Sequence, residues 1–320
     1  MVKYIFKRIA FALLTFLIIV SLCFVLIKLL PITDAAQFGQ DASVIETRRK
    51  LLGYYDPLPK QYVTFLTKTL FGGDWGVGEQ IYRTKDVWEI FVEKLPPTML
   101  LNVYSMVFAV PLGLAFGIYA ALKKNKWQDH FISTSVMIIV SVPSYVYAFL
   151  VQYFLCYKLG WFPFLMKEGT DYLSWDMFVS VVPAVLSLSF GTIAGLTRYT
   201  RAELTEVLTS DFMLLARTKG LTKAQATTRH ALKNAMVPIF PMIVGEFIGI
   251  ISGSMIIESI FGVPGVGGLY IKSITGNQGN PDYNFFMLLS SFYTLIGLLS
   301  GIVIDLSYGF IDPRIRMGER

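Results

Sequence analysis

Long apolar stretches recur along the 320-residue chain and set the pattern of its sequence. Because each residue of an α-helix advances the chain by only about 1.5 Å, a helix needs about 20 mainly apolar residues to cross the hydrocarbon core of a bilayer. Six stretches meet this requirement, so the pattern predicts an all-α integral membrane protein with six transmembrane helices. The predicted spans are Ile9–Leu30, Met99–Leu122, Ile132–Cys156, Val179–Tyr199, Val237–Ile260 and Phe285–Gly309.

The distribution of Lys and Arg predicts how these spans are oriented. Cytoplasmic loops carry an excess of positive charge close to the membrane. Basic residues cluster before the first span, after the second, between the fourth and the fifth, and after the last. Both termini are therefore expected in the cytoplasm. The clustered residues are Lys3, Lys7, Arg8, Lys123, Lys124, Lys126, Arg198, Arg201, Arg217, Lys219, Lys223, Arg229, Lys233, Arg314, Arg316 and Arg320.

The composition agrees with this membrane assignment. Hydrophobic residues make up 54% of the chain and charged residues only 16%, against about 25% charged residues in soluble domains. The net charge of +6 is explained by the basic loops, so it does not indicate nucleic-acid binding. Cys23 and Cys156 both fall in predicted spans, where a thiol behaves as a small apolar group. Neither a disulfide framework nor a metal cluster is expected.

The longer polar segment, residues 31–97, is expected on the outer side of the membrane. It contains turn-rich motifs at Gly53–Pro59 and Phe71–Gly76, with an amphipathic stretch, Gln61–Leu70, between them. This pattern favours a small external cap of short helices. A plain connector is the alternative, although connectors longer than about 15 residues are usually functional or disordered.

The second polar segment, residues 200–236, predicts a helical hairpin in the cytoplasm. Its first helix is expected over Ala202–Lys219, where leucine and valine recur at helical spacing, and Gly220 provides the stop. Thr222 and Gln225 have the spacing of a capping box and open the second helix.

Two interpretations of this hairpin stay open from spacing alone. The first is a solvated connector, which is what most charged loops are. The second is a docking element, because the small residues Ala216 and Gly220, beside Leu214 and Leu215, form a knob that would fit a groove in another protein.

Two acidic residues, Glu246 and Glu258, fall in or at the edge of the predicted fifth span. A carboxylate at the centre of a span costs about 2.5 to 3.5 kcal/mol, which roughly a dozen apolar neighbours at about −0.3 to −0.6 kcal/mol each offset. Because intramembrane acids often mark a transport path, both are candidate path residues, Glu246 in particular. The alternative is a hydrogen-bonded acid that serves packing alone.

Glycines four residues apart and prolines also recur inside the spans. The glycines predict close helix packing within a bundle or at a subunit interface. The prolines predict kinks. The residues are Gly113 with Gly117, Gly191 with Gly195, Gly245 with Gly249 and Gly253, Gly297 with Gly301, and Pro111, Pro143 and Pro241.

No stretch of the sequence has the pattern of a nucleotide-binding or catalytic site. The glycine-rich Gly262–Gly268 lacks the Lys-Ser or Lys-Thr pair of a phosphate-binding loop, and it is expected outside, away from ATP. His130 and His230 have no nucleophile or ligand partner at a suitable spacing. An enzyme is not expected, and active transport by this chain would need another subunit to supply energy.

The cytoplasmic hairpin resembles a known signature. Asp211–Leu221, followed by Arg229–Ala235 and Pro238, is similar to the signature loop of ABC importer permeases, in the version found in the dipeptide, oligopeptide and nickel branch. The sequence departs from that branch at Thr84–Asp86 and at Glu246. These departures concern which ligand is expected and not which family the sequence resembles. Further stretches that resemble the branch are Phe71–Gly76, Lys158–Pro163, Glu258–Gly267 and Asp312–Arg316.

This resemblance implies a type I ABC importer permease of a bacterial plasma (inner) membrane that moves oligopeptides or dipeptides. A nickel or other small-solute importer of the same family is the alternative. The implied partners are a second similar permease chain, one or two cytosolic ATPase subunits, an external peptide-binding protein and membrane lipid. ATP and Mg²⁺ would bind the ATPases, and this chain would hold no cofactor. The hairpin would be a coupling helix, whose implied ATPase-coupling residues are Asp211, Leu214, Leu215, Ala216, Arg217, Lys219, Gly220 and Arg229.

The expected organisation has four parts. Residues 1–30 form the N-terminal tip and first span, residues 31–97 the external segment, residues 98–310 the five-helix core with the hairpin at 200–236, and residues 311–320 a cytoplasmic tail. A secondary transporter is disfavoured because no internal repeat with charged midplane residues is visible. A scaffold or receptor without transport would not need a docking hairpin.

Overall fold

The computed structural model describes residues 2–30, 42–51, 53–277 and 279–311. These residues form helices and the turns between them, with isolated β-bridges but no continuous strand. The all-α prediction is confirmed for this part of the chain. The C-terminal motif Asp312–Arg316, the remainder of the expected tail, and the side chain of Lys3 lie outside the described residues.

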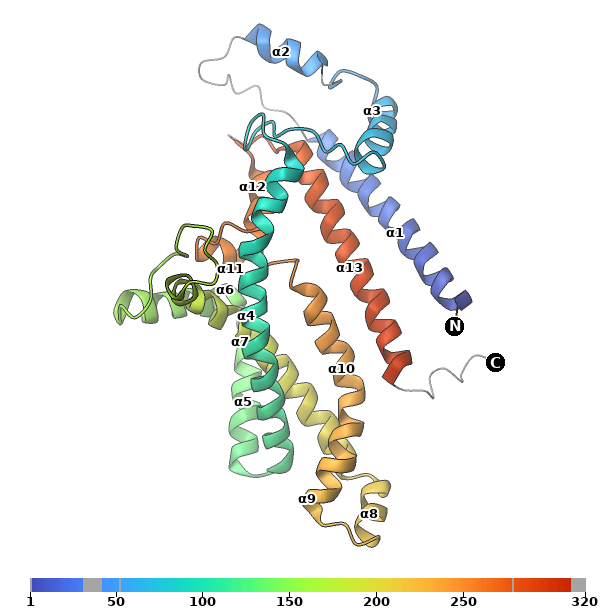
Figure 1. The fold of residues 1–320 in the computed structure, drawn as a ribbon, viewed down its shortest axis with the longest axis vertical. Helices are drawn as coiled ribbons and strands as arrows, with labels where there is room; N and C mark the ends of the chain where they lie inside the picture. Colours follow the sequence, from blue (N-terminus) through green and yellow to red (C-terminus); the bar gives the residue numbers. More distant parts are fainter. Residues whose placement is uncertain (1, 31–41, 52, 278, 312–320) are drawn as a thin grey trace.

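In the part of the chain that the structure describes, five helices are long and apolar enough to cross a bilayer (Figure 1). One of these five helices is made of three consecutive elements. α9 (Lys223–Ala226) and the π-helical η3 (Thr227–Ala231) continue without a break into α10, and together they form a single helix of 27 residues. The long helices are α1 (Val2–Leu29), α4 (Val87–Leu122), α7 (Trp175–Leu208), α10 (Leu232–Gly249) and α13 (Tyr283–Ile311).

The third predicted span is bent. After α5 (Trp127–Ser141), the chain turns by 103° into α6 (Ser144–Val151) and the π-helical η2 (Gln152–Lys158). Val142 has φ −96° and ψ 128°, the extended conformation that a residue before proline prefers, and Pro143 has no N–H to continue the helix. Among the described residues, the candidate spans number five, or six if the bent pair counts as one span.

The fifth predicted span begins and ends earlier in the sequence than expected. α10 ends at Gly249, and the chain turns through residues 250–254 before the short α11 (Met255–Ile260). Gly253 has φ +67°, a left-handed conformation that glycine adopts without strain, and Ser254 caps the new helix. The prediction of one helix up to the end of α11 is therefore wrong. The other prolines expected to produce kinks, Pro111 and Pro241, lie inside α4 and α10, which continue past them.

The external segment contains short helices in its described part, as predicted. They are α2 (Ala42–Leu51), α3 (Leu58–Thr64) and the π-helical η1 (Phe65–Leu70). α4 already begins at Val87, so the start of this long helix lies inside the expected external segment. Residues 31–41 lie outside the described residues.

Glycines allow α4 and α7 to pack closely. A Cβ atom on Gly113 would lie 2.7 Å from the Cβ of Leu196, and one on Gly117 would lie 2.5 Å from the Cβ of Thr200. Between these two points, the Thr197 hydroxyl donates a hydrogen bond to the carbonyl of Gly113 at 3.2 Å. The predicted close packing is confirmed for this glycine pair.

The helices form an elongated molecule with two different ends (Figure 1). α2 and α3 lie at one end, which we call the cap end. α8 (Asp211–Thr218) and α9 lie at the other, which we call the hairpin end. α1 and α13 run side by side along one flank, and α6 projects from the opposite flank.

Candidate functional site

The hairpin end is built around the short helix α8. α7 ends at Leu208, and Thr209 and Ser210 turn the chain into α8. Their hydroxyls donate hydrogen bonds to carbonyls of the preceding turn, Thr209 to Thr205 at 3.1 Å and Ser210 to Val207 at 2.6 Å. Such bonds compete with a continuing helix. The prediction of one unbroken helix from Ala202 to Lys219 is therefore wrong.

The turn that follows α8 has the predicted chemistry. Gly220 has φ +87°, as a glycine just past a helix end commonly does. The Thr222 hydroxyl accepts a hydrogen bond from the N–H of Gln225 at 3.3 Å, and the Gln225 side chain accepts one from the N–H of Thr222 at 3.0 Å. The predicted capping box is confirmed.

α8 has a buried face and an exposed face. Met213 and Ala216 are buried against side chains of α7 and of the helix that begins with α9. Leu214 and Leu215 are 63% and 56% exposed and form what we call the apolar tip. The prediction that Ala216 shares an exposed knob with the two leucines is therefore wrong. The leucines point outward, while Ala216 faces the body of the molecule.

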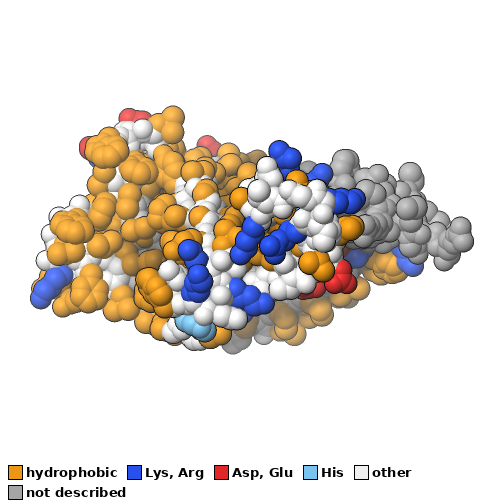
Figure 2. Space-filling model, turned by 90° about the horizontal axis from the view of Figure 1, so that it is seen from below, with side chains coloured by type: hydrophobic (Ala, Val, Ile, Leu, Met, Phe, Trp, Pro, Cys, Tyr) orange, Lys and Arg blue, Asp and Glu red, His pale blue; other side chains and the backbone are white. Residues whose placement is uncertain are grey.

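Basic side chains surround the apolar tip. Arg217, Lys219, Lys223 and Arg229 are exposed, and Figure 2 shows Lys and Arg gathered over the hairpin end. Asp211 begins α8, where a carboxylate interacts favourably with the positive end of the helix dipole. Two exposed leucines inside a positive rim suit a protein partner with an apolar groove and acidic surroundings.

A cleft of about 540 Å³ lies beside α8, against the turn that joins α4 to α5. Most of its charged lining residues are basic, and they extend the positive surface of the hairpin end. The charged residues that line it are Lys124, Lys126, Asp211, Arg217 and Lys223.

Sequence reasoning did not identify the ion pair between Arg201 and Asp129, which joins α7 to α5. Arg201 donates from Nε to Asp129 Oδ1 and from Nη2 to Oδ2, the latter at 2.8 Å. The N–H of Asn125 donates to the same carboxylate at 2.9 Å, and Asp129 is 1% exposed. The sequence around both residues is rich in other charges, so it gave no signal that singles out this pair.

Glu246 lies on an uncovered face of α7 and α10. Its side chain is exposed, and its carboxylate accepts a long hydrogen bond of 3.5 Å from the Thr192 hydroxyl. A Cβ atom on Gly195 or Gly249, one helical turn further along each helix, would have no neighbour within 4 Å. We call the surface of Thr192, Gly195, Glu246 and Gly249 the open face. It can accept a substrate or a second chain.

Glu258 is the second acid that the sequence suggested for a transport path, and the structure contradicts this role. Its side chain is 0% exposed. One carboxylate oxygen accepts a hydrogen bond from Thr98 Oγ1 at 2.9 Å, and the other accepts one from the N–H of Gly268 at 3.0 Å. Thr98 in turn accepts one from the N–H of Val266, where α12 (Val266–Thr275) begins. Glu258 therefore connects α4, α11 and α12.

At the cap end, Asp282 holds the loop that precedes α4. Its Oδ2 accepts hydrogen bonds from the backbone N–H groups of Glu79, Gln80 and Ile81, at 2.8, 2.7 and 3.0 Å. Tyr54 donates a hydrogen bond to the Glu79 carboxylate from the segment between α2 and α3. Burial and the neighbouring carboxylate raise the pKa of Tyr54, so its hydroxyl stays a donor.

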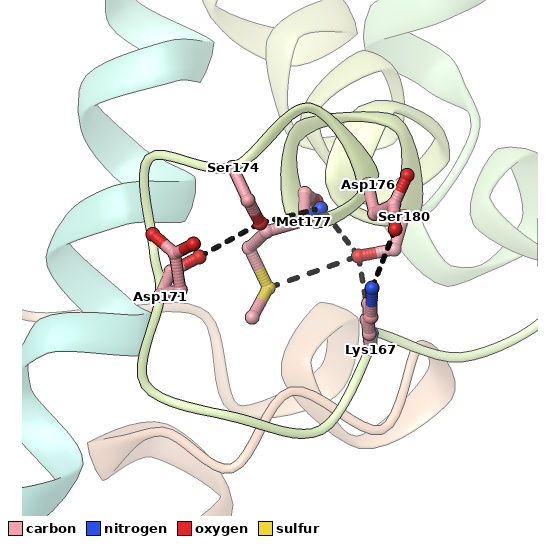
Figure 3. Close-up of polar contacts among 6 residues, drawn as sticks. All are labelled: Lys167, Asp171, Ser174, Asp176, Met177 and Ser180. Atoms are coloured by element: carbon pink, nitrogen blue, oxygen red, sulfur yellow. Dashed lines mark hydrogen bonds and ion pairs between the residues drawn. The ribbon is translucent and has the colours of Figure 1, made fainter.

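The loop between η2 and α7 is also fixed at its α7 end (Figure 3). Lys167 Nζ lies 2.6 Å from Asp176 Oδ2, and the backbone N–H of Lys167 donates to the Ser180 hydroxyl at 3.0 Å. Ser174 caps α7 by accepting a hydrogen bond from the N–H of Met177 at 3.3 Å. This loop and the one held by Asp282 are therefore anchored segments.

Comparison with known proteins places the chain among transport permeases. Residues 113–317 match the family of binding-protein-dependent transport system inner membrane components, and residues 1–102 match the N-terminal family of the same membrane components. The dipeptide transport system permease protein DppB of Lactococcus lactis subsp. cremoris is 31% identical, over 99% of this chain and 100% of that protein. The oligopeptide transport system permease protein OppB of Haemophilus influenzae is 32% identical over the same shares.

A third relative, the glutathione transport system permease protein GsiC of Salmonella typhimurium, is 31% identical over 99% of both chains. Among solved structures, a chain of the MetNI methionine ABC transporter in an inward-facing conformation matches with a TM-score of 0.52 and 16% identity, covering 69% of this chain and 97% of its own. A chain of an amino acid ABC transporter matches with a TM-score of 0.50 and 20% identity, covering 68% and 92%. The fold is thus that of a type I importer permease, and the chain belongs to the family of binding-protein-dependent transport system inner membrane components.

Proposed function

We propose that this chain is a permease subunit of an ATP-driven importer that moves oligopeptides or dipeptides delivered by an external binding protein. The observation that carries the proposal is the apolar tip of α8, ringed by basic residues at the hairpin end. The full-length relatives named for dipeptide, oligopeptide and glutathione transport support a peptide substrate. The nickel alternative is not favoured by any of these relatives.

The proposed assembly pairs this chain with a second similar permease and with one or two cytosolic ATPase subunits. The chain itself would catalyse nothing and hold no cofactor, since its sequence has no phosphate-binding loop. ATP and Mg²⁺ would be bound by the ATPases. In this arrangement, the hairpin end and both termini face the cytoplasm of a bacterial cell, and the cap end faces the external binding protein.

The connections of α8 explain how an ATPase would move the membrane helices. Thr209 and Ser210 alone separate α8 from α7, so a displacement of α8 is passed directly to that helix. On its other side, the capped turn leads into the single helix of 27 residues, Lys223–Gly249. A helix of this length is about 40 Å long and acts as a stiff lever that reaches the open face.

The open face is the proposed route of the substrate. Thr192 and Glu246 lie there between small residues, on the two helices that α8 would move. A second permease chain facing this surface would enclose a path between the two subunits. Glu258 takes no part in this path, because its carboxylate is buried and accepts hydrogen bonds from Thr98 and Gly268.

The proposal is tested by purifying the chain with its co-expressed partner subunits and measuring ATP hydrolysis in liposomes. We expect hydrolysis to rise when a peptide and the external binding protein are added together. Stimulation by nickel with its binding protein, and not by peptide, would replace the peptide assignment. Purification without any associated ATPase would contradict the importer assignment itself.

A further inference from the structure

A cleft of about 490 Å³ lies between α1 and α13, at the end of α1 where the chain begins. Both helices that form it are candidate membrane spans. Its rim is basic, and its interior is apolar except for one threonine. The residues that define it are Lys7, Arg8, Phe11, Thr15, Gly297 and Gly301.

The cleft exists because two glycines leave a trough in α13. A Cβ atom on Gly297 or on Gly301 would meet nothing within 4 Å. These glycines were expected to bring two helices into close contact, as Gly113 and Gly117 do. The Gly297–Gly301 pair instead forms one wall of an open space, so it makes no close helix contact within this chain, and a contact at a subunit interface stays a prediction.

The two basic residues at the rim, Arg8 and Lys7, have different surroundings. Arg8 Nη2 lies 2.8 Å from Asp305 Oδ2, and this ion pair ties α1 to α13. Lys7 is exposed beside it, with its Nζ 5.8 Å from the centre of the Phe11 ring. Among the described residues, Lys7 is in no ion pair, so its charge lies at the rim above an apolar trough.

We propose that this cleft binds one anionic phospholipid, with its headgroup at Lys7 and Arg8 and an acyl chain along Gly297 and Gly301. A ligand that is anionic at one end and apolar along its length fits both parts of the lining. Anionic lipids are attracted by basic residues at the cytoplasmic surface of a membrane. The proposal rests on the proposed topology, in which this end of α1 is cytoplasmic, but not on the transported substrate.

The test uses the full chain purified with its co-expressed partners, and native mass spectrometry of bound lipid. Phosphatidylglycerol is titrated against phosphatidylcholine and, in a separate arm, against inorganic phosphate. Lys7→Gln removes the unpaired rim charge. Gly301→Leu places a side chain in the trough, where an added Cβ atom would have no neighbour within 4 Å. Lys233→Gln is the matched control, because it removes an exposed basic residue of the hairpin end that lies outside the cleft.

We expect Lys7→Gln to weaken phosphatidylglycerol binding about fivefold and to leave phosphatidylcholine binding unchanged. Gly301→Leu should reduce retention of both lipids, and Lys233→Gln should change neither. Equal phosphatidylglycerol binding in all three variants would overturn the proposal. So would displacement of the lipid by inorganic phosphate at equal concentration, or retention of lipid only after residues 312–320 are deleted.

These outcomes are separate from the importer assignment. Lipid retention is measured without ATP, peptide or binding protein. A transporter that couples peptide to ATP hydrolysis but holds no lipid in this cleft would overturn only the lipid site. A chain that holds the lipid but associates with no ATPase would overturn only the proposed function.

Discussion

Arg201 on α7 reaches both carboxylate oxygens of Asp129 on α5, across 72 positions of the sequence. This two-point contact fixes the start of α5 against α7, close to the hairpin that we propose for coupling. The carboxylate is buried and also accepts a hydrogen bond from the backbone of Asn125, so the turn between α4 and α5 is held by the same group. The ion pair is therefore a structural joint of the hairpin end.

Asp129→Asn should lower the stability of the chain measurably. The substitution removes the charge that Arg201 needs and leaves its guanidinium with a weaker acceptor. We expect a loss of about 2 kcal/mol, because hydrogen bonds to charged groups are among the stronger ones and Arg201 keeps part of its solvent contact. Thermal unfolding in detergent, followed by loss of the monodisperse peak in size-exclusion chromatography, measures it.

Asp56→Asn is the matched control for this prediction. Asp56 pairs with Lys60 at 3.0 Å on the surface of the cap end, where both side chains are exposed. Exposed pairs contribute about 0 to 1 kcal/mol. If the two substitutions lower the unfolding temperature equally, Asp129 and Arg201 do not form a buried structural joint.

Gly117→Ala should destabilise the packing of α4 against α7. The added methyl group would lie 2.5 Å from the Cβ of Thr200, so the helices must separate. Gly195→Ala adds the same methyl group to the open face, where nothing lies within 4 Å. Unfolding of the isolated chain should start at a lower temperature in the first variant alone, and equal unfolding temperatures would contradict the close packing.

The substitutions Glu258→Ala and Glu246→Ala should show that Glu258 stabilises the fold and that Glu246 lies on the transport path. Removal of Glu258 leaves the buried donors of Thr98 and Gly268 without their acceptor, at a cost of about 1 to 3 kcal/mol. Removal of Glu246 exposes no buried donor, so stability should stay within about 0.5 kcal/mol while the rate of uptake changes. A stable Glu258→Ala variant with altered uptake would reverse this assignment.

Leu214→Asp combined with Leu215→Asp should release the ATPase from the purified complex. The two side chains are exposed, so the substitution places charge in the proposed interface without disturbing the buried face of α8. Leu51→Asp, at the cap end, is the control, since Leu51 is 83% exposed and lies far from the hairpin end. Retention of the ATPase by the double variant would contradict docking through the apolar tip.

Gly220→Leu tests the turn that positions α8. Gly220 has φ +87°, which strains any residue with a Cβ by roughly 1 kcal/mol, while the space around it is open. We expect normal membrane insertion but ATP hydrolysis that no longer drives uptake. Gly160→Leu, with φ +62° and equally open surroundings on the η2–α7 loop, controls for the strain alone.

The sequence was most informative where local chemistry decides the structure. Apolar stretches predicted the long helices, and Thr222 with Gln225 predicted a capping box that the structure contains. The burial of Ala216 could not be read from spacing, because it depends on how α8 packs against α7. The backward hydrogen bonds of Thr209 and Ser210, which end α7, were missed although both residue types favour them.

Long-range polar contacts were out of reach of the sequence. Glu246 and Glu258 looked alike, yet one is exposed beside Thr192 and the other is 0% exposed. One partner that makes the difference is Thr98, which lies 160 positions from Glu258 in the sequence. Asp305 and Asp129 were not recognised as paired acids, because their partners Arg8 and Arg201 lie on other helices.

The most direct test of the proposed function is the accumulation of a labelled peptide inside sealed liposomes that contain the assembled transporter. We predict accumulation that requires ATP and the external binding protein, and that is lost when Leu214 and Leu215 are both replaced by Asp. Peptide that fails to accumulate while ATP and binding protein are present, or that accumulates equally without ATP, would contradict the importer assignment.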